Sequence, residues 1–513
     1  MLSRVYCAST IGVHARLIEV EINMSAGLPR YFLVGLPDRA VSESRDRIEA
    51  ALKNAGASFP RGRITVNLAP ANVPKEGSSF DLPIALTLLA VSGQAPSGKL
   101  NQTLAVGELA LNGKLRPVKG VLPIAEEARN SGLKYLVVPS SNGAEAAMVE
   151  GIDVLAFDNI RDVMQWLKCS NSADRVRINR ENLLKKNRPA GLPDFGDVRG
   201  QESVKRALEV AAAGGHNLVM VGPPGSGKTM MARRIPTILP PLTLDEALET
   251  TKIHSVAGIL PAGQALVRER PFRSPHHTVS DVALVGGGSI PGPGEISMAH
   301  NGVLFLDELP EFRRTALEVM RQPLEDGFVH ISRARMSVTY PGRIMLVASM
   351  NPSPSGDWYD EADPGGDSPR QMQRYMGRIS GPLTDRIDLH VDVEKVGYEE
   401  LSAKAKGESS AQILERVLQS KQIQNRRFNG KSGIYGNAQM NTKTTRQLCP
   451  LDGTSGRLMR KAMKSLRLSA RAYTRILKVS RTIADLDSSE RIRANHIAEA
   501  IQYRSLDREG WLG

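Results

Sequence analysis

Aromatic residues and cysteines are scarce in this sequence. Aromatics make up 4% of the 513 residues, so a large aromatic-lined ligand pocket is not expected. The three cysteines, Cys7, Cys169 and Cys449, lie far apart and lack the paired spacing that binds zinc or cross-links a small domain. The sequence therefore predicts no zinc site, and it fits a reducing compartment.

Long hydrophobic runs are missing as well. No segment reaches the ~20 apolar residues that a membrane-spanning helix needs. Residues 1–16 lack the apolar stretch of a secretory signal, because Arg4, His14 and Arg16 interrupt them. We therefore expect a cytoplasmic protein without a membrane partner.

Acidic residues are the minority among the charged ones. The chain has 67 Lys and Arg against 54 Asp and Glu, a net charge of +13, and residues 441–513 contribute +8 of it through 15 basic against 7 acidic residues. Such a surplus favours a polyanionic partner, either nucleic acid or an anionic membrane surface. A solvated surface that keeps the protein soluble explains the composition equally well.

The chain is too long for one hydrophobic core, so two or three domains are expected. Residues 1–168 mix strand-like and helical stretches punctuated by Gly and Pro, which predicts an α/β domain. Residues 169–195 are polar, with mixed charge and few apolar anchors, as in a linker. Residues 196–395 predict a three-layer α/β core, and residues 396–513 are predicted to be helical.

Apolar runs predict the strands of this core. LVMV (218–221), VLFL (303–306) and IMLVAS (344–349) are continuous apolar segments, as in a parallel sheet that is covered on both faces. Helices are expected at 201–213 and 410–427. A further helix is predicted where apolar residues recur at helical spacing, at Leu468, Ala472, Ile476, Val479 and Ile483.

A glycine-rich segment follows the first core strand. It matches G-x-x-x-x-G-K-[ST] between a predicted strand and a predicted helix, as a phosphate-binding loop requires. Glycines let consecutive backbone N–H groups turn towards phosphates, Lys228 reaches the β- and γ-phosphates, and the Thr229 hydroxyl binds Mg²⁺. The segment therefore predicts binding of ATP with Mg²⁺ by Gly222, Pro223, Pro224, Gly225, Ser226, Gly227, Lys228 and Thr229.

Two further strand ends carry polar groups. Asp307 and Glu308 follow strand 303–306, and we assign Asp307 to Mg²⁺ and Glu308 to polarising the attacking water. Strand 344–349 leads to Asn351, whose amide can sense the γ-phosphate or place the water. Because Pro352 follows, a plain turn is the alternative for Asn351.

The loop and the acid pair lie within longer characteristic segments, GGHNLVMVGPPGSGKTMMARRI and FRSPHHTVSDVALVGGGSIPGPGEISMAHNGVLFLDELPEF, and SARAYTRILKVSRTIADLD follows near the C-terminal end. GLPDRAVSESRDRI and NLAPANVPKEGSSFDLPIAL occur in the first domain. Together these segments resemble the ComM/YifB family of magnesium-chelatase-like AAA+ ATPases. The resemblance implies an AAA+ P-loop core with a helical lid at 396–513, and a Lon-protease-like first domain of degenerate S16 type.

The same resemblance assigns roles to two arginines. Arg386, in GPLTDRIDLHV, stands where such proteins place an arginine finger that reaches the γ-phosphate of the neighbouring subunit, and Arg471, in SARAY, matches the second sensor of the lid. A cation supplied by a neighbour couples hydrolysis to assembly, so a ring, expected to be a hexamer, is implied. Alternatively, Arg386 pairs with Asp385 or Asp388, and Arg471 belongs to a solvated helix face.

Two inserts also resemble the family. HISRARMSVTY, within 329–341, alternates like a two-stranded ribbon, and related rings direct such hairpins into the central pore. Arg333 and Arg335 would share one strand face and contact DNA phosphates; solvated charges at a turn are the alternative. In the earlier insert, His276 and His277 have no matching acid or Cys cluster and are interpreted as structural.

The first domain carries an incomplete catalytic pair. Ser79, in KEGSS, falls at the nucleophile position of the Lon-type serine–lysine fold, and Leu122 takes the place of its catalytic lysine. A serine without its base is a poor nucleophile, and Lys119 is three residues away from that place. We therefore expect a non-catalytic domain.

The leading hypothesis is a ring-shaped, ATP-driven DNA motor. The family resemblance implies a branch-migration helicase that acts on single-stranded, forked or branched DNA during integration of transforming DNA and recombination. The basic charge and the pore hairpin agree with it. The alternatives are a magnesium-chelatase-like motor subunit and a protein-remodelling AAA+ regulator.

Overall fold

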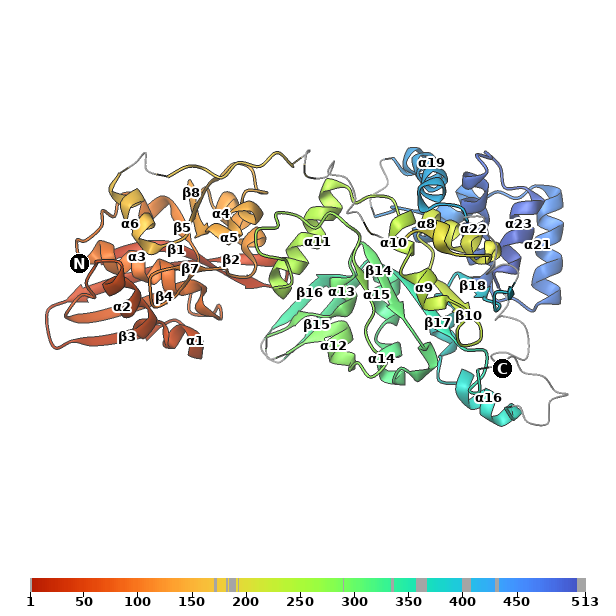
Figure 1. Cartoon of the computed structure of the whole chain (residues 1–513), viewed down its shortest axis with the longest axis horizontal. Helices are drawn as coiled ribbons and strands as arrows, with labels where there is room; N and C mark the ends of the chain where they lie inside the picture. The colour runs from red at the N-terminus through yellow and green to blue at the C-terminus, as the bar shows by residue number, and fades with distance from the viewer. Residues whose placement is uncertain are drawn as a thin grey trace. The chain divides into compact units, whose positions relative to one another are not determined.

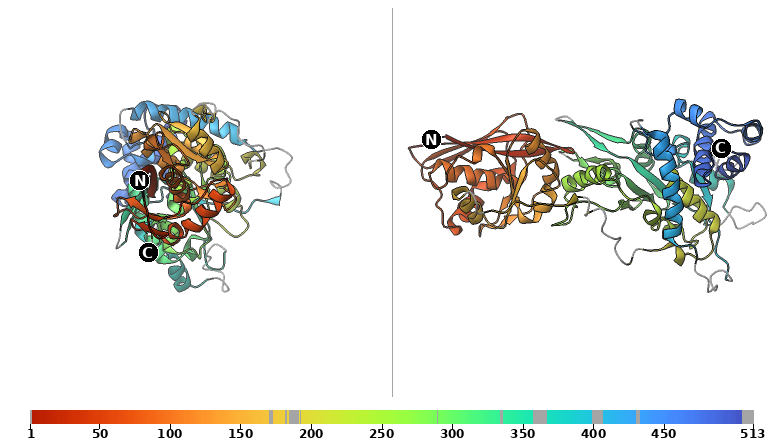
Figure 2. Two further views of the ribbon diagram at one scale, coloured as in Figure 1. Left: turned by 90° about the vertical axis from the view of Figure 1, so that its left-hand side faces the viewer. Right: turned by 90° about the horizontal axis from the view of Figure 1, so that it is seen from above.

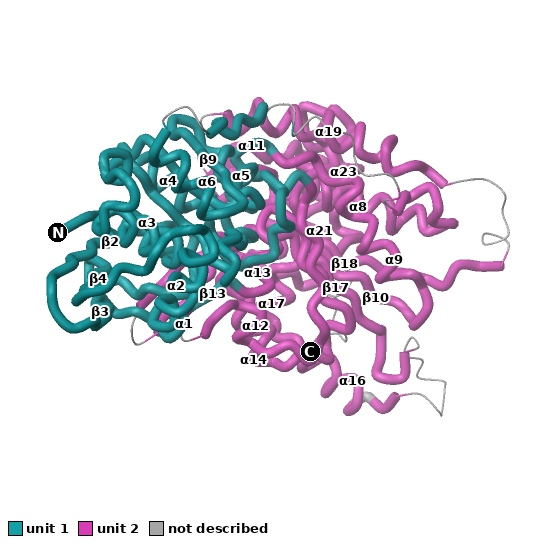
Figure 3. The backbone as a smooth tube through the Cα atoms, turned by 60° about the vertical axis from the view of Figure 1, so that its left-hand side comes forward, with its two compact units in different colours: residues 1–187, 243–268, 291–293 teal, residues 188–242, 269–290, 294–513 magenta. Residues whose placement is uncertain are grey.

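The structure, a computed structural model, describes residues 2–169, 173–180, 183, 191, 193–288, 290–333, 336–356, 367–398, 407–429 and 433–504. The chain forms two compact units, which Figure 3 colours separately. Unit 1 comprises Met1–Asn187, Thr243–Arg268 and Pro291–Pro293, and unit 2 comprises Arg188–Leu242, Glu269–Ile290 and Gly294–Gly513.

Unit 1 is built on a mixed sheet with the strand order β3-β4-β2-β1-β5-β8-β9. Its strands are β1 (Leu2–Ile11), β2 (His14–Ser25), β3 (Arg30–Val34), β4 (Arg63–Ala69), β5 (Thr103–Ala105), β8 (Tyr135–Pro139) and β9 (Asp153–Phe157). The long strands β1 and β2, red in Figures 1 and 2, pair antiparallel from Leu2 opposite Asn23 to Ile11 opposite His14. Alternate residues of these strands are buried, so one sheet face belongs to the core.

Helices lie on both faces of the sheet. They are α1 (Arg39–Ser42), α2 (Ser44–Asn54), α3 (Asp81–Val91), α4 (Val121–Asn130), α5 (Ser140–Ala146) and α6 (Ile160–Lys168). α3 is apolar around almost its whole circumference and is buried against β1 and β2. α4 packs on the opposite face of these strands, where Gly120 at its start lies against Thr10. A short ribbon, β6 (Glu108–Leu109) with β7 (Leu115–Arg116), lies next to α3.

A segment from the middle of the chain also belongs to unit 1. Helix α11 (Leu244–Ala257) starts with a capping box between Thr243 and Glu246, and Gly258 ends it in the left-handed conformation. It packs on α4, where Lys252 pairs with Glu126 at 2.7 Å, and on the short strand β13 (Gly292–Pro293). Residues 243–268 were predicted within the 196–395 core, but their packing joins them to the N-terminal unit.

Unit 2 contains a parallel sheet in the order β11-β14-β17-β10-β18. The strands are β11 (Phe272–Arg273), β14 (Gly302–Leu306), β17 (Ile344–Met350), β10 (Leu218–Val221) and β18 (Leu389–Asp392). The three strands predicted from apolar runs, at 218–221, 303–306 and 344–349, are confirmed, and β17 lies between β10 and β14. The ends of these three strands therefore adjoin one another.

Among the described residues after 407, all regular secondary structure is helical. The longer helices are α19 (Ser410–Phe428), α20 (Thr442–Leu448), α21 (Gly453–Ser465), α22 (Ala470–Leu486) and α23 (Ala494–Gln502). The predicted helices at 410–427 and around residues 468–483 are confirmed by α19 and α22. Both pack on α8 (Glu202–Gly214), and one hydrophobic cluster runs from the sheet into these helices.

Shorter elements complete unit 2. They are α9 (Lys228–Ala232), α10 (Ile235–Ile238), α12 (Asp281–Val285), β12 (Gly286–Gly287), α13 (Glu295–Met298), α14 (Arg314–Glu318), α15 (Arg321–Asp326), β15 (Phe328–Ser332), β16 (Ser337–Pro341), α16 (Pro369–Met376) and α17 (Gly381–Thr384). β15 and β16 pair antiparallel, which confirms the predicted hairpin. None of the described helices is long and apolar enough to cross a membrane.

The predicted linker at 169–195 falls partly outside the described residues. Within the described part, the Val176 N–H donates to Val154 O of β9 at 3.0 Å, and Arg175 pairs with Asp153 at 3.0 Å. These residues therefore extend the packing of unit 1 beyond residue 168.

Candidate nucleotide site

The glycine-rich loop joins the end of β10 to the start of α9. A Cβ on Gly222 would lie 2.1 Å from Val393 O, so the close approach of two backbones requires glycine there. Gly227 has φ +89°, in the left-handed region, directly before α9. The turn therefore needs its glycines for its shape, as the loop motif predicts.

Lys228 lies within this loop. Its Nζ donates to Gly222 O at 2.5 Å, to Pro223 O at 2.9 Å and to Asn351 Oδ1 at 3.2 Å. Burial lowers the pKa of Lys228, and the carboxylates that follow β14 oppose the shift. The end of β17 thus brings Asn351, the predicted sensor, into contact with the lysine.

Thr229 and Asp307, predicted together as Mg²⁺ ligands, are in contact. The Thr229 Oγ1 hydroxyl donates to Asp307 Oδ2 at 2.7 Å, and the other carboxylate oxygen accepts from Ser349 Oγ. Parallel pairing of Leu306 with Ala348 sets this register, so the residues that follow them also adjoin. The sequence analysis missed Ser349; its only signal was a polar residue inside an apolar strand.

Glu308 stands beside these groups with its side chain 57% exposed. Its backbone has φ +55°, a left-handed conformation that is uncommon for residues other than glycine. Its N–H donates to Ser349 Oγ at 3.4 Å, so one hydroxyl contacts both acids. His277 Nδ1 lies 3.4 Å from Glu308 Oε2, a neighbour that the structural interpretation of His277 did not foresee.

The residues present fit a Mg²⁺–nucleotide. Ser226 Oγ is buried in the loop without a hydrogen-bond partner among the described residues, as expected for a group whose partner is a ligand. Lys228 is satisfied only by loop carbonyls and an amide oxygen, which phosphate oxygens can replace. Thr229 and Asp307 offer the hydroxyl and carboxylate oxygens that Mg²⁺ prefers.

Arg386 is almost buried, with 8% of its surface exposed. It pairs with Glu325 Oε1 at 2.5 Å and donates to Pro382 O at 2.5 Å, while its Nε has no partner among the described residues. The alternative pairings with the aspartates on either side are not observed. Asp385 forms an ion pair with Arg471 instead, at 2.9 Å.

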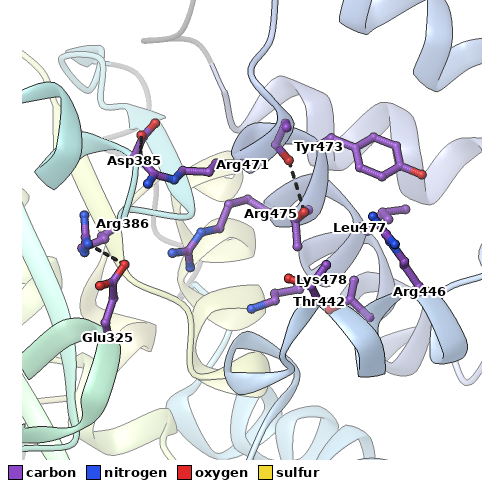
Figure 4. A pocket seen from close by; sticks show the side chains of 13 residues that line it. Glu325, Asp385, Arg386, Thr442, Arg446, Arg471, Tyr473, Arg475, Leu477 and Lys478 are labelled. Atoms are coloured by element: carbon purple, nitrogen blue, oxygen red, sulfur yellow. Dashed lines mark hydrogen bonds and ion pairs between the residues drawn. The ribbon is translucent and has the colours of Figure 1, made fainter. Parts of the chain in front are cut away.

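Arg386 and Arg471 line one pocket of about 430 Å³, shown in Figure 4. Arg475 and Lys478, from the same helix α22 as Arg471, also line it. The Arg471 side chain is 67% exposed, as the solvated alternative expects, and that of Arg475 is 22% exposed. Lys478 is buried, which lowers its pKa to about 8. The pocket therefore concentrates cationic groups beside Arg386.

Asp388 connects Arg475, which lines this pocket, to His216, which precedes β10. It accepts from Arg475 at 2.5 Å and lies 3.0 Å from His216 Nδ1, whose other nitrogen contacts Thr482 Oγ1 at 2.8 Å. Burial alone would raise the pKa of Asp388, but Arg475 and His216 hold it below its usual range. The network links α22 to the strand that follows Arg386.

The predicted pore hairpin is described only in part. Arg333 is exposed at its tip and its N–H donates to Met336 O at 3.0 Å. Its guanidinium lies close to Gly287, where a Cβ would be 2.9 Å from Arg333 Nη2, so the two inserts meet. Arg335 lies outside the described residues, and whether it shares a face with Arg333 stays a prediction.

In unit 1, the residues at the Lon-like positions have other partners. Leu122 is fully buried on α4, and its N–H donates to Glu145 Oε1 at 2.8 Å. Glu145 also accepts from Ser255 of the α11 segment, and burial raises its pKa despite these hydrogen bonds. Lys119 packs against Gly258, the residue that ends α11. Segment 243–268 therefore occupies the neighbourhood of both Leu122 and Lys119.

A parallel sheet that sets a P-loop strand, a sensor strand and an acid-bearing strand side by side defines a P-loop nucleotide-binding protein of the AAA+ class. Models of magnesium chelatase subunit ChlI match residues 20–142 (Subunit ChlI of Mg-chelatase), 194–401 (Magnesium chelatase, subunit ChlI) and 407–504 (Magnesium chelatase, subunit ChlI C-terminal).

Whole-chain similarity is more specific. YifB of Escherichia coli K12 and competence protein ComM of Haemophilus influenzae are each 45% identical to this chain, over 99% of its length and 98% of theirs. The chain belongs to the ComM/YifB family of magnesium-chelatase-like AAA+ ATPases. Lon protease 2 of Bacillus subtilis is 34% identical over 189 residues, 33% of this chain and 34% of its own.

Proposed function

We propose that this protein is an ATP-driven, ring-shaped DNA motor, of the branch-migration helicase type that acts in integration of transforming DNA and in recombination. The observation that carries the proposal is one cluster of side chains at three adjoining strand ends. Lys228 contacts Asn351, and Thr229 contacts Asp307 next to Glu308. These are the groups that phosphoryl transfer to water requires.

The cluster supports ATP hydrolysis step by step. Bound Mg²⁺–ATP supplies the γ-phosphoryl group, with the metal neutralising part of its charge. Lys228 exchanges its carbonyl partners for phosphate oxygens, and Thr229 and Asp307 hold the metal. Glu308, the exposed acid, accepts the proton of the attacking water, and Asn351 orients that water.

Arg386 and Arg471 act on the nucleotide of a neighbouring subunit in this proposal. Within one chain Arg386 is held by Glu325, so a neighbour's phosphate has to compete with that carboxylate for the guanidinium. The helices after residue 407 then serve as the lid that carries Arg471. Hydrolysis becomes coupled to assembly, for which a hexamer is the expected form.

The DNA substrate is supported by charge and by relatives. Residues 441–513 hold +8 of the net charge of +13, and the hairpin presents Arg333 at its tip. The relative from Haemophilus influenzae is named competence protein ComM, which supports a role connected with competence. Single-stranded, forked or branched DNA is the substrate class that we propose, in the cytoplasm.

A magnesium-chelatase motor subunit is the second candidate. The three matching family models, all named for the chelatase subunit ChlI, favour it. In that case the same nucleotide site would drive metal insertion into a porphyrin through a partner subunit, and DNA would have no effect on the ATPase.

A branch-migration assay tests the proposal. The full-length protein should convert a labelled forked or four-way DNA into its migrated products with ATP and not with a non-hydrolysable analogue. Glu308→Gln provides the matched control, because it replaces one carboxylate oxygen with an amide NH2 group of similar size and removes the charge. Product formation that is equal in the wild type and in Glu308→Gln, or absent in an ATPase-active wild type, would contradict a DNA motor.

A further inference from the structure

At the β3-β4 edge of the unit 1 sheet one face is buried and the other is exposed. On β4, Ile64, Val66 and Leu68 are buried beneath the helices, while Arg63 is exposed and Thr65 and Asn67 are half-exposed on the opposite face. Edge strand β3 alternates in the same way and exposes Arg30, Phe32 and Val34.

Strand register brings the open-face residues into rows. Parallel pairing sets Arg30 beside Arg63, Phe32 beside Thr65 and Val34 beside Asn67. Antiparallel pairing continues the rows onto β2, with Asn23 beside Thr65 and Glu21 beside Asn67. The hydrogen bond from Asn67 Nδ2 to Glu21 Oε2, at 2.9 Å, confirms that these side chains share the face.

The charges on this face are unequally satisfied. Glu21 accepts from Asn67, and Glu19 pairs with Arg4 at 2.9 Å. Arg30 and Arg63 are directly opposed like charges, and neither forms an ion pair with a residue that the structure describes. Like charges opposite one another destabilise a sheet, so this pair is better suited to an external anion than to the fold itself.

An exposed aromatic ring lies within the basic end of the face. Phe32 is 39% exposed, and the Arg63 guanidinium lies over its ring, 5.4 Å from the centroid. A nucleic acid base can stack on the ring in place of the guanidinium, which then pairs with the adjoining phosphate. Bases in a duplex are already stacked, so this arrangement suits a single strand.

We infer that the open face around Arg30, Phe32 and Arg63 is a binding platform for single-stranded DNA. The identity of the nucleic acid rests on the proposed function; the face itself is defined by its own geometry. Phe32 stacks a base, Arg30 and Arg63 contact phosphates, and the Asn23 amide and the Thr65 hydroxyl border the bases. Unit 1 thereby acquires a role in holding a displaced strand.

Binding of full-length protein to labelled oligo-dT, and to a duplex of equal length, tests the platform by fluorescence anisotropy over a salt series. Phe32→Ala should weaken single-strand binding about 5- to 100-fold, the effect of losing one base–aromatic stack, and should leave duplex binding unchanged. Arg30→Ala/Arg63→Ala should flatten the salt dependence of single-strand binding by about 1.4, two phosphates at about 0.7 each.

Lys53→Ala/Lys134→Ala is the matched control. It removes two exposed cations from other parts of unit 1, and Lys134, like Arg63, lies over an aromatic ring, 5.1 Å from the centroid of Tyr135. Its single-strand affinity should equal that of the wild type. Equal Tm values in calorimetry verify that the variants fold, and a photo-reactive phenylalanine analogue at position 32 should crosslink to oligo-dT.

The outcomes separate this inference from the proposed function. If the wild type binds DNA and the Phe32 and arginine variants bind it equally well without a crosslink at position 32, only the platform is overturned. If these variants lose assembly in light scattering while monomers bind oligo-dT normally, the face is an interface between copies of the chain, and the platform is likewise wrong. If the wild type binds no DNA, the proposed function and the platform both fail.

Discussion

The protein carries two sites that resemble catalytic centres, one in each unit, and they differ in completeness. In unit 2, Lys228, Thr229 and Asp307 are in contact with partners from neighbouring strands. In unit 1, the resemblance to Lon-type proteases predicts a nucleophile position at Ser79 and a base position at Leu122, which is fully buried. The nucleotide-binding motif therefore has its partner residues, whereas the Ser79 motif lacks a lysine at the expected position.

The difference shows that a motif acts through the residues that other segments bring to it. The nucleotide loop receives Asn351 and Asp307 from two adjoining strands. The neighbourhood of Leu122 receives Ser255 and Gly258 from the α11 segment, which hydrogen-bond and pack there. The α11 segment therefore supplies structural contacts to the neighbourhood of Leu122 in unit 1.

The largest expected effects fall on the nucleotide site. Lys228→Ala should abolish nucleotide binding, because the loop loses its only cation that contacts the phosphates. Glu308→Gln should bind Mg²⁺–ATP normally but hydrolyse it about 10²- to 10⁴-fold more slowly, since only the proton acceptor is lost. Calorimetric titration and steady-state ATPase distinguish the two. Near-normal hydrolysis by Glu308→Gln would remove this acid from the mechanism.

Arg386→Ala should keep ATP binding and lose hydrolysis about 10³-fold or more, with a defect that acts between subunits. Mixing Arg386→Ala subunits with Lys228→Ala subunits should restore part of the ATPase, because some interfaces then combine an intact loop with an intact arginine. No recovery at any ratio, in rings confirmed to be mixed, would show that Arg386 acts within its own subunit.

His277→Ala should lower kcat about 10- to 100-fold with little change in KM, because Glu308 loses the neighbour that orients its carboxylate. His276→Ala is the control for the ring contact alone, since His276 packs on His277, with ring centroids 4.1 Å apart, and hydrogen-bonds Thr278. ATPase kinetics of both variants give the answer. An equal loss in the two variants, or none in His277→Ala, would reduce His277 to a structural residue.

Lys478 provides a test of burial in unit 2. Its pKa is lowered to about 8 from the usual 10.5, so the unfolded chain binds more protons between these values and stability rises with pH across that window. Lys478→Met should therefore be more stable than the wild type near pH 7, by an amount on the order of 3 kcal/mol, and should lose this advantage as pH rises from 8 to 10.5. Calorimetric Tm values at several pH values measure it; a constant difference would contradict the shifted pKa.

The smallest effect is expected at Ser79. Full-length protein should show no peptidase activity and no labelling by a fluorophosphonate at Ser79, because Leu122 cannot deprotonate the hydroxyl. Ser79→Ala should leave ATPase and DNA binding unchanged. Stoichiometric labelling that disappears in Ser79→Ala would instead restore a proteolytic role to unit 1.

Local patterns were sufficient to predict much of unit 2. The apolar runs of β10, β14 and β17 and the glycine-rich loop are encoded by neighbouring residues, so the sequence identified them. Ser349 and Glu325 were not predicted, because each meets its partner only through strand register or chain reversal far along the sequence. The roles assigned to the nucleotide-site residues remain predictions.

Long-range packing also explains the misplaced segment. The sequence of residues 244–257 contains the signals of a helix with an N-terminal capping box. It contains no signal for their packing on α4, more than 100 residues earlier. The exposed sheet face could not be predicted for the same reason, because Arg30 and Arg63 become neighbours only when β3 pairs with β4. In both cases the fold topology decides which segment is the neighbour. The alternation of exposed residues predicts only which side chains of a strand share a face.

The rate of ATP hydrolysis by the full-length protein, measured alone and with single-stranded, duplex or forked DNA, tests the central claim most directly. A DNA motor that uses the Lys228–Glu308 site predicts stimulation by single-stranded or forked DNA, falling with added salt as phosphate contacts weaken, and none in Glu308→Gln. A wild-type rate that is robust with Mg²⁺–ATP but identical with and without every DNA would contradict the account.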